Sequence, residues 1–135
     1  MAEKAQGGRR GKGAAPDSLD HERFVREGPQ KRFIEPRVLY LIRKNPSYGY
    51  QLTDDIGKLP FPGPTPDSAA VYRMLRELEK EGLVRSRWEH GESGPSKRVY
   101  EVTTSGEDRL AAWVEAFRER ADLLVRFIAL CEKVG

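Results

Sequence analysis

Three cationic side chains recur on one side of a helix predicted in the middle of the chain. Arg73, Arg76 and Lys80 are spaced so that they share one helical face. Ala69 shares this face, and Tyr72 lies at its edge. Exposed guanidinium and ammonium groups can bind DNA phosphates and base edges in the major groove. The alternative is a solvated face on which these cations pair with nearby glutamates. The opposite side is apolar and carries Val71, Met74, Leu75 and Leu78.

A basic hairpin is predicted to follow this helix, which spans residues 67–80. Gly82 is placed to end the helix in a left-handed conformation. Two strand-like runs, 84–88 and 98–103, then flank a loop that contains glycine and proline. A helix with a basic face followed by a basic hairpin is typical of a winged helix-turn-helix that binds DNA. The hairpin residues expected to contact DNA are Arg87, His90, Lys97 and Arg98.

Two shorter helices are predicted to position the basic helix. Pro36 fits the first turn of one helix, which ends before Asn45-Pro46. Ser47 is predicted to cap a second helix over residues 48–58. Four prolines within residues 59–67 exclude a helix from that segment. The order of elements therefore favours an α+β fold, mainly α, built as a winged helix-turn-helix.

The start of the second helix adds further expected DNA contacts. Tyr48 and Gln51 lie near a helix N-terminus, where backbone N–H groups attract phosphate. Ser68 lies at the corresponding place in the basic helix. The complete set of expected DNA-binding residues is Tyr48, Gln51, Ser68, Ala69, Tyr72, Arg73, Arg76, Lys80, Arg87, His90, Lys97 and Arg98.

The C-terminal segment predicts one long helix. Thr104 and Glu107 form a capping-box pattern that opens a helix over residues 105–133. The rest of the chain is too small to bury so long an apolar helix, so we expect a homodimer, against the alternative of packing on its own domain. The predicted dimer seam has heptad spacing and comprises Leu110, Val114, Phe117, Ala121, Leu124, Ile128 and Cys131.

Length and charge limit the domain organisation. A chain of 135 residues suits one domain plus a tail. Residues 1–32 hold eight Lys/Arg against five Asp/Glu, which accounts for the net charge of +3. We expect 1–32 to be a basic, largely disordered tail with a short helix over 17–27. Residues 33–104 then form the winged domain, and 105–135 form the dimerisation helix.

Several classes of protein are not supported by the sequence. No run approaches the roughly 20 apolar residues of a membrane span, and residues 1–30 do not resemble a secretory signal. A cytoplasmic location is therefore expected. One cysteine and two histidines make no metal-binding set, and no cofactor is expected. No motif pairs a nucleophile with a base, so the chain is not predicted to be an enzyme.

The chain resembles the PadR family of bacterial transcriptional regulators over residues 33–115. The resemblance implies a winged helix-turn-helix, and the single C-terminal helix resembles the short subfamily, whose members dimerise through that helix. Within this subfamily the proline-rich turn and wing resemble polyhydroxybutyrate-responsive repressors. Ala69-Ala70 depart from the family, which usually has Gly-Thr there and so a hydroxyl that could contact DNA. The matching segments are 33–36 (FIEP), 46–52 (PSYGYQL), 71–75 (VYRML), 81–84 (EGLV), 94–100 (GPSKRVY) and 102–106 (VTTSG).

The resemblance also implies a ligand and a mode of action. In some family members aromatic residues of the last helix line a cavity at the dimer centre. Trp113 and Phe117 are thus the residues expected to bind a small hydrophobic or aromatic effector, with interface packing as the alternative. Together these features predict a homodimeric repressor that binds double-stranded DNA at a pseudo-palindromic operator. The alternative is a winged-helix protein–protein interaction module, associated with a partner regulator or a polymer granule, without operator binding.

Overall fold

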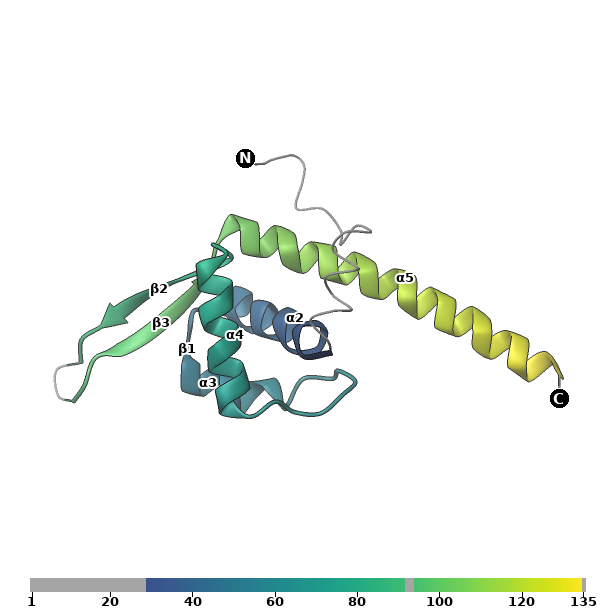
Figure 1. Cartoon of the computed structure of the whole chain (residues 1–135), viewed down its shortest axis with the longest axis horizontal. Helices are drawn as coiled ribbons and strands as arrows, with labels where there is room; N and C mark the ends of the chain where they lie inside the picture. The colour runs from purple at the N-terminus through teal and green to yellow at the C-terminus, as the bar shows by residue number, and fades with distance from the viewer. Residues whose placement is uncertain (1–28, 92–93, 135) are drawn as a thin grey trace.

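The computed structural model describes residues 29–91 and 94–134 (Figure 1). The basic tail and the short helix predicted over 17–27 lie outside these residues, apart from the last four positions of the tail. In chain order the elements are α2 (Pro29–Lys44), β1 (Ser47–Tyr48), α3 (Gly49–Ile56), α4 (Ser68–Lys80), β2 (Val84–Glu89), β3 (Lys97–Val102) and α5 (Thr104–Val134). The predicted fold class is confirmed: the protein is mainly helical, with a small antiparallel sheet and a long C-terminal helix.

The sheet has three antiparallel strands in the order β1-β3-β2. In the β2–β3 hairpin, Trp88 is opposite Arg98 and Glu89 is opposite Lys97. The short strand β1 pairs with β3 through Ser47 and Tyr100 and was not predicted from the sequence. A run of two residues is too short to be recognised as a strand from its sequence pattern. Ser47 and Tyr48 form a strand because the fold places them next to β3.

The core lies where α2, α3, α4 and the beginning of α5 meet, with the sheet along one edge (Figure 1). Apolar residues of each helix recur at helical spacing and turn inward, so burial of these stripes is the main stabilising contribution. The largest fully buried side chains include Leu39, Ile42, Leu52, Ile56, Leu75, Leu78 and Trp113.

The N-terminal ends of three helices differ from the predictions. Helix α2 starts at Pro29 and continues through Pro36, because burial of Ile34 and Glu35 holds the preceding turns in place. Ser47 does not cap α3, since its hydroxyl donates to the Asn45 carbonyl instead. Thr103 rather than Thr104 caps α5: its Oγ1 accepts a hydrogen bond from the Gly106 N–H at 3.1 Å.

A buried carboxylate joins the beginning of α5 to α2. Glu35 is almost completely buried, and its Oε2 accepts hydrogen bonds from Trp113 Nε1 at 2.5 Å and Arg109 Nη1 at 3.0 Å. Arg109 also lies 3.5 Å from Glu81 at the end of α4. The charge of Glu35 is therefore compensated, and α5 is fixed on the domain along its first turns.

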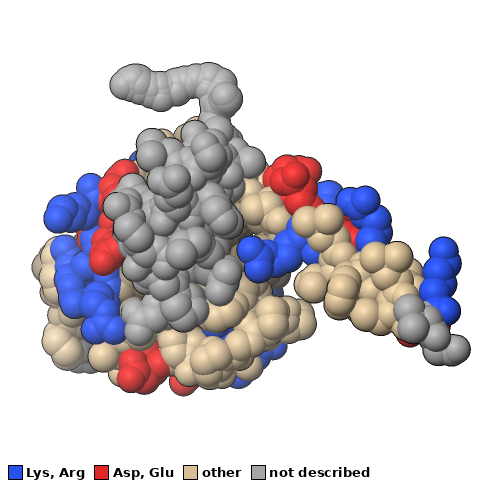
Figure 2. All heavy atoms as spheres, turned by 45° about the vertical axis from the view of Figure 1, so that its right-hand side comes forward, with Lys and Arg blue, Asp and Glu red and all other residues tan. Residues whose placement is uncertain are grey.

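The second half of α5 extends away from the domain. Figure 1 shows the helix continuing past α2, and Figure 2 shows its distal part standing clear of the body with a mainly uncharged surface. Apolar side chains there are more than half exposed, including Leu124 at 56% and Ile128 at 52%. Among the described residues, no helix combines the length and apolar character needed to cross a bilayer.

Candidate nucleic-acid interface

Helix α4 has well-defined ends that fix which of its residues are exposed. At its start the Asp67 side chain accepts a hydrogen bond from the Ala70 N–H at 2.9 Å, which is an N-cap as expected for aspartate. At its end Gly82 has φ 79°, and the Leu83 N–H donates to the Leu78 carbonyl at 2.9 Å. This is the left-handed termination that the sequence predicted. Ser68 is exposed in the first turn.

The predicted basic face of α4 is exposed and electrically uncompensated. Arg73, Arg76 and Lys80 are exposed, and none of them forms a salt bridge within the part of the chain that the structure describes. The alternative that these three cations pair with nearby glutamates is therefore not observed among the described residues. Glu79 instead accepts a hydrogen bond from the Ser86 hydroxyl at 2.6 Å. The three cations can thus bind an anionic partner without breaking an internal pair.

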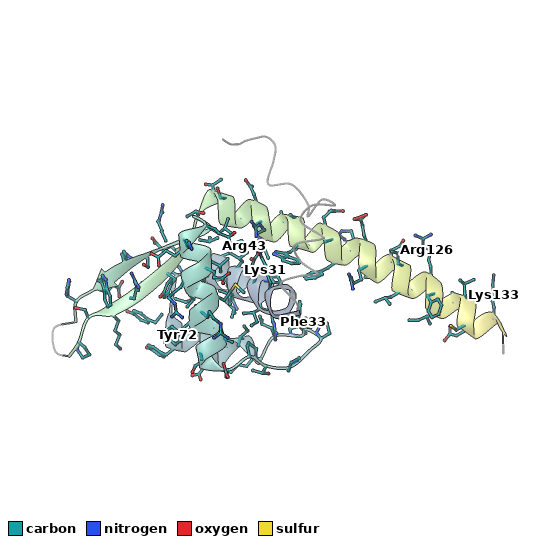
Figure 3. The ribbon with its side chains drawn as sticks, viewed as in Figure 1. Lys31, Phe33, Arg43, Tyr72, Arg126 and Lys133 are labelled. Atoms are coloured by element: carbon teal, nitrogen blue, oxygen red, sulfur yellow. The ribbon has the colours of Figure 1, made fainter. Side chains whose placement is uncertain are left out.

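Tyr72 lies at the edge of this face and contacts the start of α3. Its ring covers Gly49 so closely that a β-carbon built on Gly49 would lie 2.8 Å from Tyr72 Cζ and Oη. Figure 3 shows Tyr72 between α4 and α3. Gln51 caps α3, because its Oε1 accepts a hydrogen bond from the Tyr48 N–H at 2.9 Å, while Gln51 itself remains exposed. Tyr72 therefore helps to set the angle between the two helices.

Tyr48 belongs to an aromatic and charged cluster at the loop end of the paired strands β2 and β3. The rings of Tyr48 and Tyr50 stack with centroids 5.6 Å apart and planes 6° apart. Lys97 Nζ lies 5.5 Å from both centroids, within range of a cation–π interaction. The Tyr48 hydroxyl donates to Glu89 at 2.5 Å, and this hydrogen bond raises the pKa of Tyr48. Lys97 is therefore held on two rings close to the exposed helix start.

The adjacent cross-strand pair of the hairpin carries a second cation–π interaction. Arg98 Cζ lies 5.2 Å from the centroid of Trp88, its cross-strand partner. Trp88 is 57% exposed, which is unusual for a tryptophan. His90 Nδ1 lies 2.6 Å from the Ser96 hydroxyl across the loop. Arg87 contacts Glu89 at 3.5 Å within its own strand, which partly neutralises its charge.

Trp88 and Tyr50 are exposed members of the candidate interface that are not among the predicted DNA-binding residues. Alternation along the two strands of the hairpin could have placed Trp88 on the same face as Arg98. No local pattern could have predicted the Tyr48–Tyr50 stack, because Gly49 between them begins a helix while Tyr48 ends a strand.

Tyr100, which faces the core, is buried, and burial raises its pKa.

Two assignments on α5 need correction. Trp113 is only 2% exposed and donates its indole N–H to Glu35, so it belongs to the core of its own chain and not to an effector cavity or interface. Leu110 is buried in the same core, which removes it from the predicted dimer seam. Phe117 is half-buried and packs against Trp113 and Phe61. The seam residues that are exposed are Val114, Ala121, Leu124, Ile128 and Cys131.

The described residues contain no cluster of three or more side chains suited to hold a metal ion. Taken together, the candidate interface consists of the exposed face of α4, the start of α3 and the β2–β3 hairpin. Its charged groups are mostly cationic, the hairpin glutamates Glu89 and Glu101 are paired with Arg87 and Arg85, and the aromatic rings carry two of the remaining cations. This composition suits an anionic polymer.

A family model matches more than half of this chain. The Transcriptional regulator PadR-like family matches residues 38–112. The transcriptional regulator YqjI of Escherichia coli (strain K12) is 28% identical over 118 residues, which are 87% of this chain and 49% of that protein. The chain thus spans about half the length of this curated relative.

Solved structures resemble the fold. A PadR family transcription regulator from Clostridium difficile R20291 aligns with a TM-score of 0.61 at 20% identity, covering 71% of this chain and 98% of that one. Bacillus subtilis PadR in complex with operator DNA aligns with a TM-score of 0.52 at 25% identity, covering 59% of this chain and 46% of that one.

Proposed function

The chain belongs to the PadR-like family of transcriptional regulators, which are not enzymes, and on this premise we propose that it is a homodimeric repressor of a pseudo-palindromic operator. The observation that carries the proposal is the exposed face of α4, where Arg73, Arg76 and Lys80 lack ion-pair partners among the described residues. In this proposal the protein acts in the cytoplasm, where it binds double-stranded DNA.

Helix α4 is proposed to enter the major groove. Arg73 and Arg76 lie one turn apart, so both can reach base edges or phosphates while the apolar stripe stays in the core. Ala69 and Ser68 lie in the first turn, which in such helices is closest to the bases. Ala69 offers only a methyl group, which suits contact with a thymine methyl better than hydrogen bonding.

The hairpin is proposed to hold the flanking backbone. Lys97 and Arg98 are held on aromatic rings, which reduces the side-chain entropy lost when each binds a phosphate. Such contacts contribute affinity that depends on salt and not on sequence. The hairpin therefore supplies general affinity, whereas α4 supplies sequence preference.

The exposed half of α5 supports the proposal of a homodimer, with residues 105–135 as the dimerisation segment. Leu124, Phe127, Ile128 and Leu130 are each more than half exposed, and leaving such side chains in water costs on the order of 1 kcal/mol or more apiece. Pairing of two α5 helices removes this cost and can place two α4 helices about one DNA turn, 34–36 Å, apart. Occupancy of both half-sites would exclude other proteins from the operator, which is the proposed mode of repression.

Electrophoretic mobility shifts with DNA from upstream of the protein's own gene test the proposal. Arg73→Ala and Arg76→Ala should each weaken specific binding by about 1–3 kcal/mol if the arginine reads a base. Lys97→Ala should weaken binding to all sequences equally and lower the salt dependence. Lys133→Ala, which removes the same charge at the far end of α5 (Figure 3), should have little effect.

The proposal makes the Arg73→Ala/Arg76→Ala double variant decisive. If that variant keeps full operator affinity with an intact fold, α4 does not read DNA. If the unaltered protein binds no DNA upstream of its gene at low salt, the domain instead serves protein–protein interaction.

A further inference from the structure

Trp88 lies in the β2–β3 hairpin at a place where its ring is not needed by the core. More than half of the residue is exposed, whereas Val84, at the start of the same strand, is buried. Within the described part of the chain Trp88 belongs to no aromatic pair, and Arg98 is the one cation over its ring. The indole therefore presents a large, flat, apolar surface that a partner can cover.

The side of the hairpin that carries Trp88 is the side on which α4 lies. Side chains alternate between the two faces of a strand, so Ser86 and Trp88 share one face of β2. The Ser86 hydroxyl donates to Glu79 of α4 at 2.6 Å. Arg98 is opposite Trp88 on β3 and lies over the indole, so it shares this face. Trp88 is thus one step outward from the contact between the hairpin and α4, with a cation beside it.

The hairpin is long enough to reach the groove next to the one proposed for α4. Trp88 is four residues along β2 from Val84, which is about 13 Å in an extended strand. The major groove of B-DNA is about 12 Å wide, and the next groove across the backbone is the minor groove. Figure 1 shows the hairpin projecting from the body on the side opposite to the end of α5. With α4 in the major groove, the hairpin can therefore carry Trp88 across the backbone.

We propose that Trp88 inserts into the minor groove beside each half-site and partly unstacks one base step there, while Arg98 binds a phosphate of that step. A flat apolar ring makes few favourable contacts with a phosphate, but it leaves water and gains van der Waals contacts when it enters between two bases. Unstacking costs least at flexible pyrimidine–purine steps such as TA and CA, so insertion gives the hairpin a sequence preference of its own. This inference rests on the proposed DNA-binding function and adds a second source of specificity to that of α4.

The test places 2-aminopurine in the operator, because the fluorescence of this base rises when it leaves the stack. With the half-sites mapped by footprinting, a single 2-aminopurine replaces each adenine of the flanking segments in turn. Binding of the full chain should raise the emission at one flanking step of each half-site, and Trp88→Ala should abolish this rise. Trp88→Phe, which keeps a smaller flat ring, should retain most of it.

Mobility shifts on the same duplexes measure the contribution to affinity. Trp88→Ala should weaken operator binding about 10-fold, as expected when an aromatic ring stacked on a base is removed. Changing the flexible step to AA should weaken binding of the unaltered protein and leave that of Trp88→Ala nearly unchanged.

Tyr50→Ala is the matched control, because it removes another half-exposed aromatic ring of the same interface and should keep the 2-aminopurine rise. Since both positions are exposed, all these variants should give the circular dichroism of the unaltered protein.

The alternative role for Trp88 is to hold Arg98 in place without touching a base. In that case no emission should rise, and Trp88→Ala should have no further effect in the Arg98→Ala background. Insertion instead requires that Trp88→Ala weakens binding in that background as well.

The inference and the proposed function fail in different ways. If the protein shifts the operator but no flanking 2-aminopurine responds, or if the rise persists in Trp88→Ala, then Trp88 does not insert and the DNA-binding function stands. If the unaltered protein shifts no DNA from upstream of its gene, the proposed function fails and the insertion fails with it.

Discussion

Replacing Glu35 with alanine should lower the free energy of unfolding by about 2–4 kcal/mol, although Glu35 is buried and is not among the residues proposed to bind DNA. Its Oε2 accepts the buried indole N–H of Trp113 at 2.5 Å, and a hydrogen bond to a charged acceptor contributes about 1.5–3 kcal/mol. The ion pair with Arg109 adds less, about 1 kcal/mol or below, because the arginine side chain is 30% exposed and water can replace its partner.

Matched variants separate the two contributions. Glu35→Gln keeps an amide oxygen that can accept from Trp113 but loses the charge, so it should cost less than Glu35→Ala. Arg109→Ala should cost more than a surface pair normally does, because it leaves the buried Glu35 carboxylate with Trp113 as its one donor among the described residues. A double-mutant cycle of Glu35→Ala with Trp113→Phe should show a coupling of about 1 kcal/mol or more.

Urea denaturation followed by circular dichroism measures these differences. The measurement should be repeated at several protein concentrations, because the stability of an associating protein depends on concentration. A change below about 1 kcal/mol for Glu35→Ala would refute the reasoning. It would mean that the indole N–H and the guanidinium find other partners once the carboxylate is gone.

Two further predictions concern association and helix geometry. Replacing Leu124 and Ile128 together by Asp should give a monomer by sedimentation equilibrium, with the winged domain still folded by circular dichroism; sedimentation of the unaltered protein as a monomer at micromolar concentration would contradict the dimer. Gly49→Ala should displace Tyr72 and lower operator affinity while Tyr72→Phe, which keeps the ring, changes it little. Equal mobility shifts for Gly49→Ala and the unaltered protein would show that the Tyr72 ring moves aside without consequence.

The sequence predicted those features that depend on local chemistry. The end of α4 followed from Gly82, which adopts a positive φ without strain, whereas the helix starts one residue later than predicted because Asp67 caps it from outside. The exposed side of α4 followed from helical spacing alone. Strand-like composition on both sides of a loop with glycine and proline predicted the two strands of the hairpin to within one residue at each end.

The features that were missed depend on contacts distant in the sequence. Leu110 fits the heptad pattern, yet it is buried in the core, as is Trp113 in the next turn, whose indole donates to Glu35, 78 positions earlier. A periodic pattern shows that a helix has an apolar side but not which protein surface covers it. Likewise, the buried charge of Arg37 was not foreseen, because nothing around it in the sequence suggests that the proline-rich segment folds over it.

The bonds of Glu35 to Arg109 and Trp113 form a clamp that fixes the beginning of α5 on α2, and this clamp has a mechanical consequence. Beyond Phe117 every side chain of α5 that the structure describes is exposed, and this part of the helix is about 25 Å long. Because a helix behaves as a stiff rod over this length, and Val134 lies about 30 Å beyond Trp113, a tilt of about 10° at Trp113 moves the last turn by about 5 Å. The bonds of Glu35 to Arg109 and Trp113 thus act as the pivot of a lever. In a pair of chains joined at the ends of these levers, the separation of the two winged domains would be set by this pivot, deep inside each domain.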